Sequence, residues 1–324
     1  MRMENKNLSR QVKEFLAYKR SNGCIYTGGE YHLKRYVAFS GCLSPHESVP
    51  SKRTVEAFMD RYLGSPGSLY NAVAVIREFG RYLYGRGYSN VYIIPAKKVP
   101  LPTPVQPYFF TAKEISSFFE ACDNITEDMH YRGRHLVLPT MYRLLYCCGL
   151  RCKEVRTLSC KNIHLNQRYI DVMQSKGPKS RRIFISEELV DYLDNYDRAI
   201  SRLFPERQTF FPNRNDLPYG AQMLEKNFHK LWYRAFPEMR TSDISIRPYD
   251  LRHHFAYANM NRWLREGKDV NAMLPYLMKY MGHSDIENTL YYFHLVPDIY
   301  DAIIKMSMPL ESLIPEVDYH GKKE

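Results

Sequence analysis

A proline-rich segment divides the chain into two parts. Residues 94–108 read IPAKKVPLPTPVQPY and contain five prolines with no apolar periodicity. Proline removes a backbone donor and holds the chain extended, so this segment is predicted to be a semi-rigid linker. A chain of 324 residues is long enough for two domains of ordinary size, each with its own core. We therefore expect a first domain over residues 1–93 and a second over residues 109–324.

The first part shows helical periodicity. Its apolar residues recur at helical spacing in four stretches, and glycines stand at or near the ends of these stretches. This pattern predicts a four-helix domain. The stretches are residues 7–20, 29–40, 52–63 and 68–86, and the glycines are Gly23, Gly41, Gly64, Gly85 and Gly87.

The second part begins with a helix signal and changes period in its middle. Thr111 and Glu114 have the spacing of a capping box, and residues 135–148 predict a buried helix. Around the sequence SKGPKS the apolar residues alternate, which predicts a strand–turn–strand unit. Helical patterns return at Glu187, so the expected fold class is mostly α with a small antiparallel sheet (α+β). The alternating residues are Ile170 and Val172 before the turn and Ile183 and Ile185 after it.

Composition narrows the classes of function. Lys and Arg total 46 against 35 Asp and Glu, and the net charge of +11 attracts polyanions, nucleic acid first. No apolar run approaches the roughly 18 residues that a membrane span needs, and the N-terminus lacks the apolar region of a signal peptide. The seven cysteines include no C-x-x-C pair, so zinc and disulfide frameworks are poorly supported. We expect a cytoplasmic protein with reduced thiols and no membrane association.

The residues that could act on a phosphate are cations rather than metal ligands. A metal nuclease needs clustered carboxylates, and the chain has no convincing cluster. The alternative chemistry uses fixed cations and a covalent nucleophile. Arg151 follows Gly149, which ends the predicted buried helix, and therefore lies at the start of a new helix, where a phosphate is favoured. Glu154 can orient a neighbouring basic group, although a surface Arg–Glu pair explains these two residues equally simply.

Two further cations lie at a predicted turn and a predicted helix start. Lys176 lies in QSKGPKSRR at the tip of the hairpin, from which it could reach the DNA backbone and donate a proton. In IRPYDLRHHFA, Pro248 suits the first position of a helix, which places Tyr249 and Arg252 on one face at i,i+3. Taken alone, the lysine is typical of a solvated turn and the arginine of an exposed helix start.

The stretch MGHSDIENTLYYFHL near the C-terminus places two tyrosines after a Gly-His pair. His283 follows Gly282, and Tyr291 and Tyr292 come eight and nine residues after the histidine. Both tyrosines lie off the apolar stripe of a helix, so periodicity does not choose between them. A helix-capping histidine with two packing tyrosines is the simpler interpretation of this stretch alone.

In their order and spacing, these four groups resemble the tyrosine recombinase (phage integrase) family. The family pattern has an arginine in a G-L-R-x-x-E box and a lysine on a β-hairpin, followed by H-x-x-R-H-x-F-A and by G-H with a tyrosine nine residues later. The first part of the chain matches the family's helical core-binding domain, which binds DNA, and the second part matches its catalytic domain. The spacing favours Tyr292 over Tyr291. The matching residues are Gly149, Leu150, Arg151, Glu154, Lys176, Arg252, His253, Phe255, Ala256, Gly282, His283 and Tyr292.

The resemblance implies a site-specific DNA recombinase or integrase, with a role for each polar residue. Tyr292 would attack the phosphate, form a 3′-phosphotyrosyl bond and release a 5′-hydroxyl, without ATP, metal or any other cofactor. Arg151 and Arg252 would clamp the nonbridging oxygens with forked donors. Lys176 would protonate the leaving 5′-oxygen.

Three further residues complete the implied site. His283 and Tyr249 would complete the hydrogen bonds of the phosphate, and Glu154 would support Arg151. Tyr249 is a departure from the pattern, because the family usually has histidine there. A phenol can bond a phosphate oxygen, but it is a poorer proton acceptor than imidazole at neutral pH.

The resemblance also implies partners and a setting. The substrate would be double-stranded DNA target sites held by a homo-tetramer, with an accessory DNA-bending or directionality protein as a further partner. The enzyme would serve a mobile element in a bacterial cytoplasm, at the nucleoid when bound to DNA. Residues 308–317 could dock on their own domain or on a neighbouring protomer.

Two other classes of function stay open. One is a DNA-binding relative with weakened catalysis, for which Tyr249 is the hint. The other is a topoisomerase-like enzyme that relaxes DNA without recombining sites, since the strand-cleavage chemistry is the same.

Overall fold

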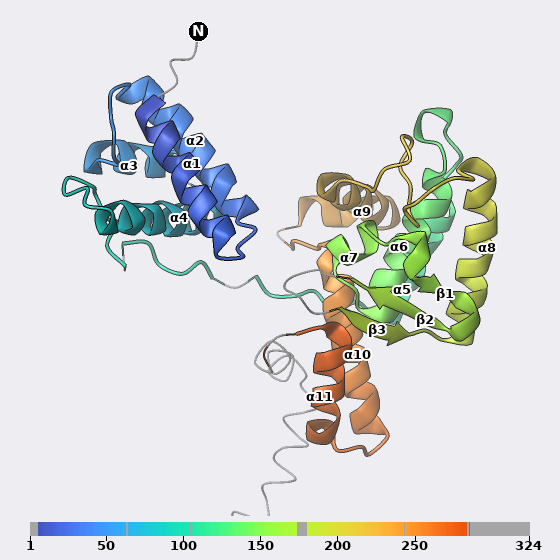
Figure 1. Cartoon of the computed structure of the whole chain (residues 1–324). Helices are drawn as coiled ribbons and strands as arrows, with labels where there is room; N and C mark the ends of the chain where they lie inside the picture. Colours follow the sequence, from blue (N-terminus) through green and yellow to red (C-terminus); the bar gives the residue numbers. More distant parts are fainter. Residues whose placement is uncertain are drawn as a thin grey trace, which may run out of the picture. The chain divides into compact units, whose positions relative to one another are not determined.

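A computed structural model of the chain describes residues 6–62, 64–96, 98–103, 105–173, 180–242, 244–283 and 285. The chain divides into two compact units, Met1–Val105 and Gln106–Glu324 (Figure 1). This division falls inside the proline-rich segment. Each unit has a core of its own.

The described part of the N-terminal unit is helical. Its helices cover the four stretches that the apolar periodicity predicts, and their buried faces meet in a single core. They are α1 (Lys6–Ser21), α2 (Thr27–Leu43), α3 (Lys52–Met59) and α4 (Pro66–Gly85), with the 3-10 turn η1 (Asp60–Tyr62) after α3.

One predicted helix stop lies two residues before the observed end of its helix. Gly41 is buried inside α2, which continues to Leu43. Gly23, by contrast, has φ 75° and lies in the turn after α1, as expected of a glycine that ends a helix. A buried glycine in a helix can instead serve close packing, and sequence spacing alone does not separate these two uses.

The start of the proline-rich segment packs on the N-terminal unit. Ile94 and Val99 are buried in its core. Arg77 of α4 donates from Nε to the Ile94 carbonyl at 2.8 Å. A side chain thus satisfies a backbone carbonyl that has no helix or sheet partner.

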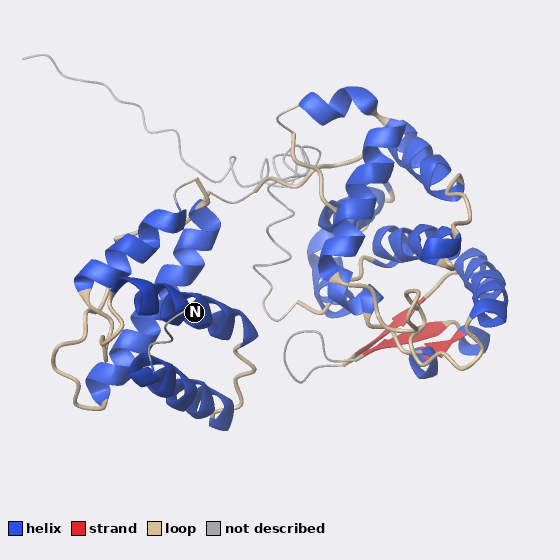
Figure 2. Ribbon diagram, turned by 90° about the horizontal axis from the view of Figure 1, so that it is seen from above, coloured by secondary structure: helices blue, strands red, loops and turns tan. Residues whose placement is uncertain are grey.

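The C-terminal unit is mostly helical with a small antiparallel sheet, which confirms the predicted fold class (Figure 2). Its described helices are α5 (Ala112–Asp123), α6 (Arg134–Cys148), α7 (Cys152–Arg156), α8 (Glu187–Leu203), α9 (Ala221–Ala235), α10 (Pro248–Arg265) and α11 (Val270–Met281). Its described strands are β1 (Ile163–His164), β2 (Tyr169–Val172) and β3 (Arg181–Phe184). Short 3-10 turns are η2 (Met129–Tyr131), η3 (Cys160–Asn162), η4 (Leu165–Gln167) and η5 (Pro237–Thr241). The capping box predicted at the start of α5 forms between Thr111 and Glu114.

The sheet has the order β1-β2-β3 with antiparallel pairing throughout. Ile170 of β2 lies opposite Ile183 of β3, and both side chains are fully buried. These are the two strands that the alternating residues predict. Strand β1 was not predicted, because two residues are too few to show alternation. The turn between β2 and β3, with Lys176, lies outside the described residues.

Helix α6 lies at the centre of this unit. It packs against α5, α7, α8 and α10. Such a helix must be apolar on most of its faces, and α6 buries nine of its 15 residues. It ends at Gly149, whose φ of 57° is left-handed, as the sequence predicts.

Helices α10 and α11 lie side by side at one end of the unit (Figure 1). Pro248 is the first residue of α10, as predicted. Leu251 joins the main core, while the later turns of α10 form a second core with α11. Among the described residues, no helix combines the length and the apolarity that a membrane span requires.

The junction at Gly149 can be tested with a matched pair of alanines. A Cβ on Gly149 would lie 2.4 Å from Cδ1 of Phe255, whereas a Cβ on Gly267 would meet nothing within 4 Å. Both glycines have a left-handed φ, 57° and 66°, so both substitutions carry the left-handed strain of roughly 1–2 kcal/mol. We expect Gly149→Ala to lower the free energy of unfolding by more than Gly267→Ala, measured in urea. Equal losses would show that Phe255 does not constrain this turn.

Candidate active site

Arg151 and Glu154 lie at the first turn of α7. The backbone N–H of Arg151 donates to Glu154 Oε2 at 2.8 Å, and Arg151 Nη1 donates to Glu154 Oε1 at 2.8 Å. The Glu154 side chain is fully buried, while that of Arg151 is 22% exposed. The pair expected from the spacing therefore forms, but its carboxylate is in the interior and not on the surface.

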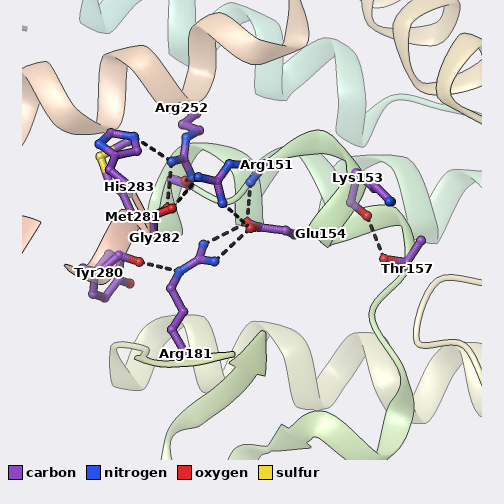
Figure 3. Close-up of polar contacts among 11 residues, drawn as sticks. Arg151, Lys153, Glu154, Thr157, Arg181, Arg252, Tyr280, Met281, Gly282 and His283 are labelled. Atoms are coloured by element: carbon purple, nitrogen blue, oxygen red, sulfur yellow. Dashed lines mark hydrogen bonds and ion pairs between the residues drawn. The ribbon is translucent and has the colours of Figure 1, made fainter. Parts of the chain in front are cut away.

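A third residue, Arg181, joins this pair from β3 (Figure 3). Its Nη1 and Nη2 donate to Glu154 Oε1 and Oε2, each at 2.8 Å. Its Nε donates to the carbonyl of Tyr280 at 2.7 Å. A buried carboxylate needs such partners, because an uncompensated charge in the interior costs several kcal/mol.

Sequence reasoning did not single out Arg181, although a signal was present. Side chains alternate between the two faces of a strand, so Arg181 shares its face with the buried Ile183. Arg182 points to the opposite face, where it pairs with Asp171. The alternation that predicted the strand therefore also predicts that Arg181 is the inward arginine.

Arg252 of α10 is fully buried. Its Nη1 donates to the carbonyl of Gly149, and its Nη2 donates to the carbonyl of Met281 at 2.8 Å. The same Nη2 lies 3.0 Å from Nε2 of His283. Acceptors at the ends of two helices thus compensate the buried charge and fix the direction of the guanidinium.

His283 follows the end of α11 at Gly282, whose φ is 67°. Its backbone N–H donates to the carbonyl of Met278 at 3.0 Å, and Arg151 Nη2 donates to the carbonyl of Gly282 at 2.5 Å. Burial, together with the charges of the nearby arginines, lowers the pKa of His283 to about 3. The imidazole is therefore neutral near pH 7. Since a guanidinium can only donate, Nε2 accepts from Arg252 and the proton lies on Nδ1.

The structure brings four of the predicted residues together: Arg151, Glu154, Arg252 and His283 (Figure 3). They come from α7, α10 and the end of α11. Gly282 allows part of this approach, because a Cβ there would lie 2.9 Å from Arg181 Nη1.

Tyr249 lies in the first turn of α10, three residues before Arg252, and is partly exposed. It is 37% exposed, and its ring meets that of His253 edge-on with centroids 4.8 Å apart. Burial, the largest cause, lowers the pKa of His253 to about 4. Lys176, Tyr291, Tyr292 and residues 308–317 lie outside the described residues, so their sites stay predictions.

The chemistry of the described group suits a phosphodiester. Two arginines and a neutral imidazole offer forked charged donors and one further N–H donor at a single place. In the described part of the chain, no group of three or more His, Cys, Asp or Glu side chains could hold a metal ion.

Comparisons with known proteins show the family of the chain. Residues 108–298 match the sequence profile of the phage integrase family. Tyrosine recombinase XerD of Pseudomonas putida (strain KT2440) is 30% identical over 237 residues, which are 71% of this chain and 72% of that protein. The chain therefore belongs to the phage integrase family, the tyrosine recombinases, which cleave and rejoin DNA strands at specific sites.

Other similar proteins extend over more of the chain. A protein of Sinorhizobium fredii (strain NGR234) described as an integrase/recombinase, y4rE, is 26% identical over 289 residues, 88% of this chain and 91% of that protein. The Tn1549 transposon integrase in complex with transposon right end DNA has a TM-score of 0.62 at 17% identity, over 93% of this chain and 99% of that chain. A lambda integrase dimer bound to a COC′ core site has a TM-score of 0.58 at 13% identity, over 86% and 95%. These two likenesses concern the fold.

The neutral state of His283 predicts a pH dependence of stability. The unfolded chain binds a proton near the ordinary pKa of 6.5, whereas the folded pKa of His283 is about 3. Since the unfolded state then holds more protons, the free energy of unfolding should fall as the pH is lowered from 6.5 toward 3. His283→Gln should flatten this slope in urea titrations.

A histidine on the surface provides the control. The side chain of His46 is exposed, so His46→Gln should leave the slope as in the wild type. Equal slopes for the wild type and His283→Gln would contradict the burial of a neutral imidazole at this position.

Proposed function

We propose that this recombinase cleaves double-stranded DNA through a 3′-phosphotyrosyl bond to Tyr292. The observation that best supports the proposal is the convergence of Arg151, Arg252 and His283 from three separate segments of the C-terminal unit. A second support is the tyrosine nine residues after the histidine, at the spacing of the family pattern.

In the proposed step, the Tyr292 oxygen attacks the scissile phosphorus and the bond from phosphorus to the 5′-oxygen breaks. The leaving oxygen takes a proton from Lys176. The tyrosine passes its proton to a base in the solvent, while His283, whose Nε2 accepts from Arg252, would donate from Nδ1 to a nonbridging oxygen of the phosphate. Because the phosphodiester is exchanged for a phosphotyrosyl ester, rejoining needs no ATP, and the cations of the chain take the place of metal ions.

The two arginines would bind the nonbridging oxygens of the phosphate. Their bonds to the carbonyls of Gly149, Met281 and Gly282 fix the guanidinium groups in advance, so little reorganisation is needed during the reaction. The Arg151 side chain is partly exposed, whereas Arg252 is fully buried. A phosphate can therefore reach Arg252 only if the surrounding side chains shift when DNA binds.

The N-terminal unit would grip the DNA as a core-binding domain. Its described helices carry exposed basic side chains, which favour a phosphate backbone over other partners. They include Lys13, Lys34, Lys52, Arg53 and Arg81.

Strand exchange would need four copies of the chain. A XerH recombinase with the same fold is bound to a palindromic difH substrate, and a palindromic site places two copies on one duplex. Exchange between two such sites then requires a homo-tetramer. Similar proteins include a transposon integrase and an integrase/recombinase, which supports a mobile element as the setting.

The nucleophile can be identified by substitution. We expect Tyr292→Phe to abolish formation of the covalent adduct and to leave DNA binding intact, because only the attacking oxygen is lost. Adduct formation on a nicked duplex that carries the site, in the presence of EDTA, is the measurement, and Tyr291→Phe is the matched control. If Tyr291→Phe loses the adduct while Tyr292→Phe retains it, the nucleophile is the neighbouring tyrosine.

Substitutions at Tyr249 test whether the phenol binds the phosphate. Removal of one preorganised donor typically lowers a rate by about 10²–10³-fold in a dry site, and the partly exposed Tyr249 should give the lower end or less. Tyr249→His should stay near the wild type, since it restores the usual family residue. Arg252→Ala should be the slowest, because a forked charged donor is lost.

The ranking of these variants is measured as the single-turnover rate of adduct formation on one substrate. A Tyr249→Phe enzyme as fast as the wild type would mean that the phenol only packs. Relaxation of plasmids that lack any site would instead favour the topoisomerase-like alternative.

A further inference from the structure

Arg181 connects three parts of the site that are distant in sequence. It lies on β3, five residues after Lys176. Its guanidinium bonds both oxygens of Glu154, 27 residues away, and the carbonyl of Tyr280, 99 residues away. It also lies against Gly282, because a Cβ on that glycine would be 2.9 Å from Arg181 Nη1. The side chain is 10% exposed.

The bonding pattern at Glu154 links Arg181 to Arg151. Glu154 Oε1 accepts from Nη1 of both arginines. Glu154 Oε2 accepts from the backbone N–H of Arg151 and from Nη2 of Arg181. Each oxygen therefore has one donor from each residue, and the carboxylate cannot turn away from Arg181 without disturbing Arg151. A lysine could not reproduce this two-pronged contact.

We propose that Arg181 is a positioning residue for DNA cleavage. Through Glu154 it fixes the guanidinium of Arg151, and through the Tyr280 carbonyl and Gly282 it fixes the turn that carries His283. The strand that follows the lysine hairpin thus sets the geometry of two phosphate-binding groups. This inference rests on the proposed function, and it adds to it a residue that touches neither DNA nor the nucleophile.

The neighbouring arginine provides a matched control. Arg182 lies on the same strand and carries the same charge, but it pairs with Asp171, and its side chain is 49% exposed. Arg182→Ala removes a cation from the opposite face of the sheet. A general effect of lower positive charge on DNA binding would therefore appear equally in Arg181→Ala and Arg182→Ala.

The experiment measures single-turnover adduct formation with the full chain in excess. The probe is a nicked DNA duplex. Its sequence is taken from the DNA that flanks the gene, from a segment to which this protein is found to bind. A misplacement of about 1 Å costs roughly 10²-fold in rate, so we expect Arg181→Ala to be slower than the wild type by about this factor, with unchanged binding of the duplex. Arg182→Ala should keep the wild-type rate. Added guanidinium ion, below denaturing concentrations, should restore part of the rate of Arg181→Ala only.

The outcomes separate this inference from the proposed function. If the wild type forms an adduct and Arg181→Ala is as fast as Arg182→Ala, Arg181 has no positioning role. If the wild type forms no adduct on any duplex that it binds, the proposed function fails instead.

Two further variants keep the test valid if Arg181→Ala unfolds. Arg181→Lys retains the charge and loses the forked contact, so it should cleave more slowly than the wild type at a temperature where both proteins are folded, and a wild-type rate would overturn the inference. In a Glu154→Gln background, Arg181→Lys should lower the rate of adduct formation by a smaller factor than it does in the wild type, because the contact between Arg181 and the side chain at position 154 is already weakened. An equal factor in the two backgrounds would show that Arg181 does not act through Glu154.

Discussion

The buried carboxylate of Glu154 holds the centre of the site together. Its side chain is fully buried and accepts bonds from Arg151 and Arg181. Removing one partner from a buried ion pair is far more costly than the pair itself is stabilising, so the three groups depend on one another. This dependence ties the start of α7 to β3. The arginine that is proposed to bind the phosphate is therefore held by the interior of the protein.

The second constraint is the close approach of two helix ends. Arg252 is buried with donors directed at the carbonyls of Gly149 and Met281, which lie at the C-terminal ends of α6 and α11. Both helices end with a left-handed glycine, Gly149 and Gly282. These glycines direct the last carbonyls toward the arginine and also admit Phe255 and Arg181 beside them. The glycines of the G-L-R and G-H motifs are therefore needed for the backbone conformation, and the arginine and histidine of the same motifs supply the side chains of the site.

Local patterns predicted most of the fold and part of the site. The N-terminal helices, the β2–β3 pair, the turn at Gly149 and the pair Arg151–Glu154 depend on residues near one another in sequence, where spacing is informative. The contacts of Arg181 with Glu154 and Tyr280 depend on how β3 packs against distant segments, which spacing does not show. For the same reason the spacing around Arg252, which taken alone is typical of an exposed helix start, did not show that this side chain is fully buried. The roles of Lys176 and Tyr292 stay predictions from the family pattern.

Arg151, Arg252 and His283 are proposed to present a DNA phosphate to one tyrosine. The most direct test is to trap the covalent complex on a nicked duplex, trim the DNA with nucleases and identify the modified peptide by mass spectrometry. We expect a single modified residue, Tyr292, joined to the 3′-phosphate of the cleaved strand. A nucleotide on any other residue, or a linkage through a 5′-phosphate, would contradict it.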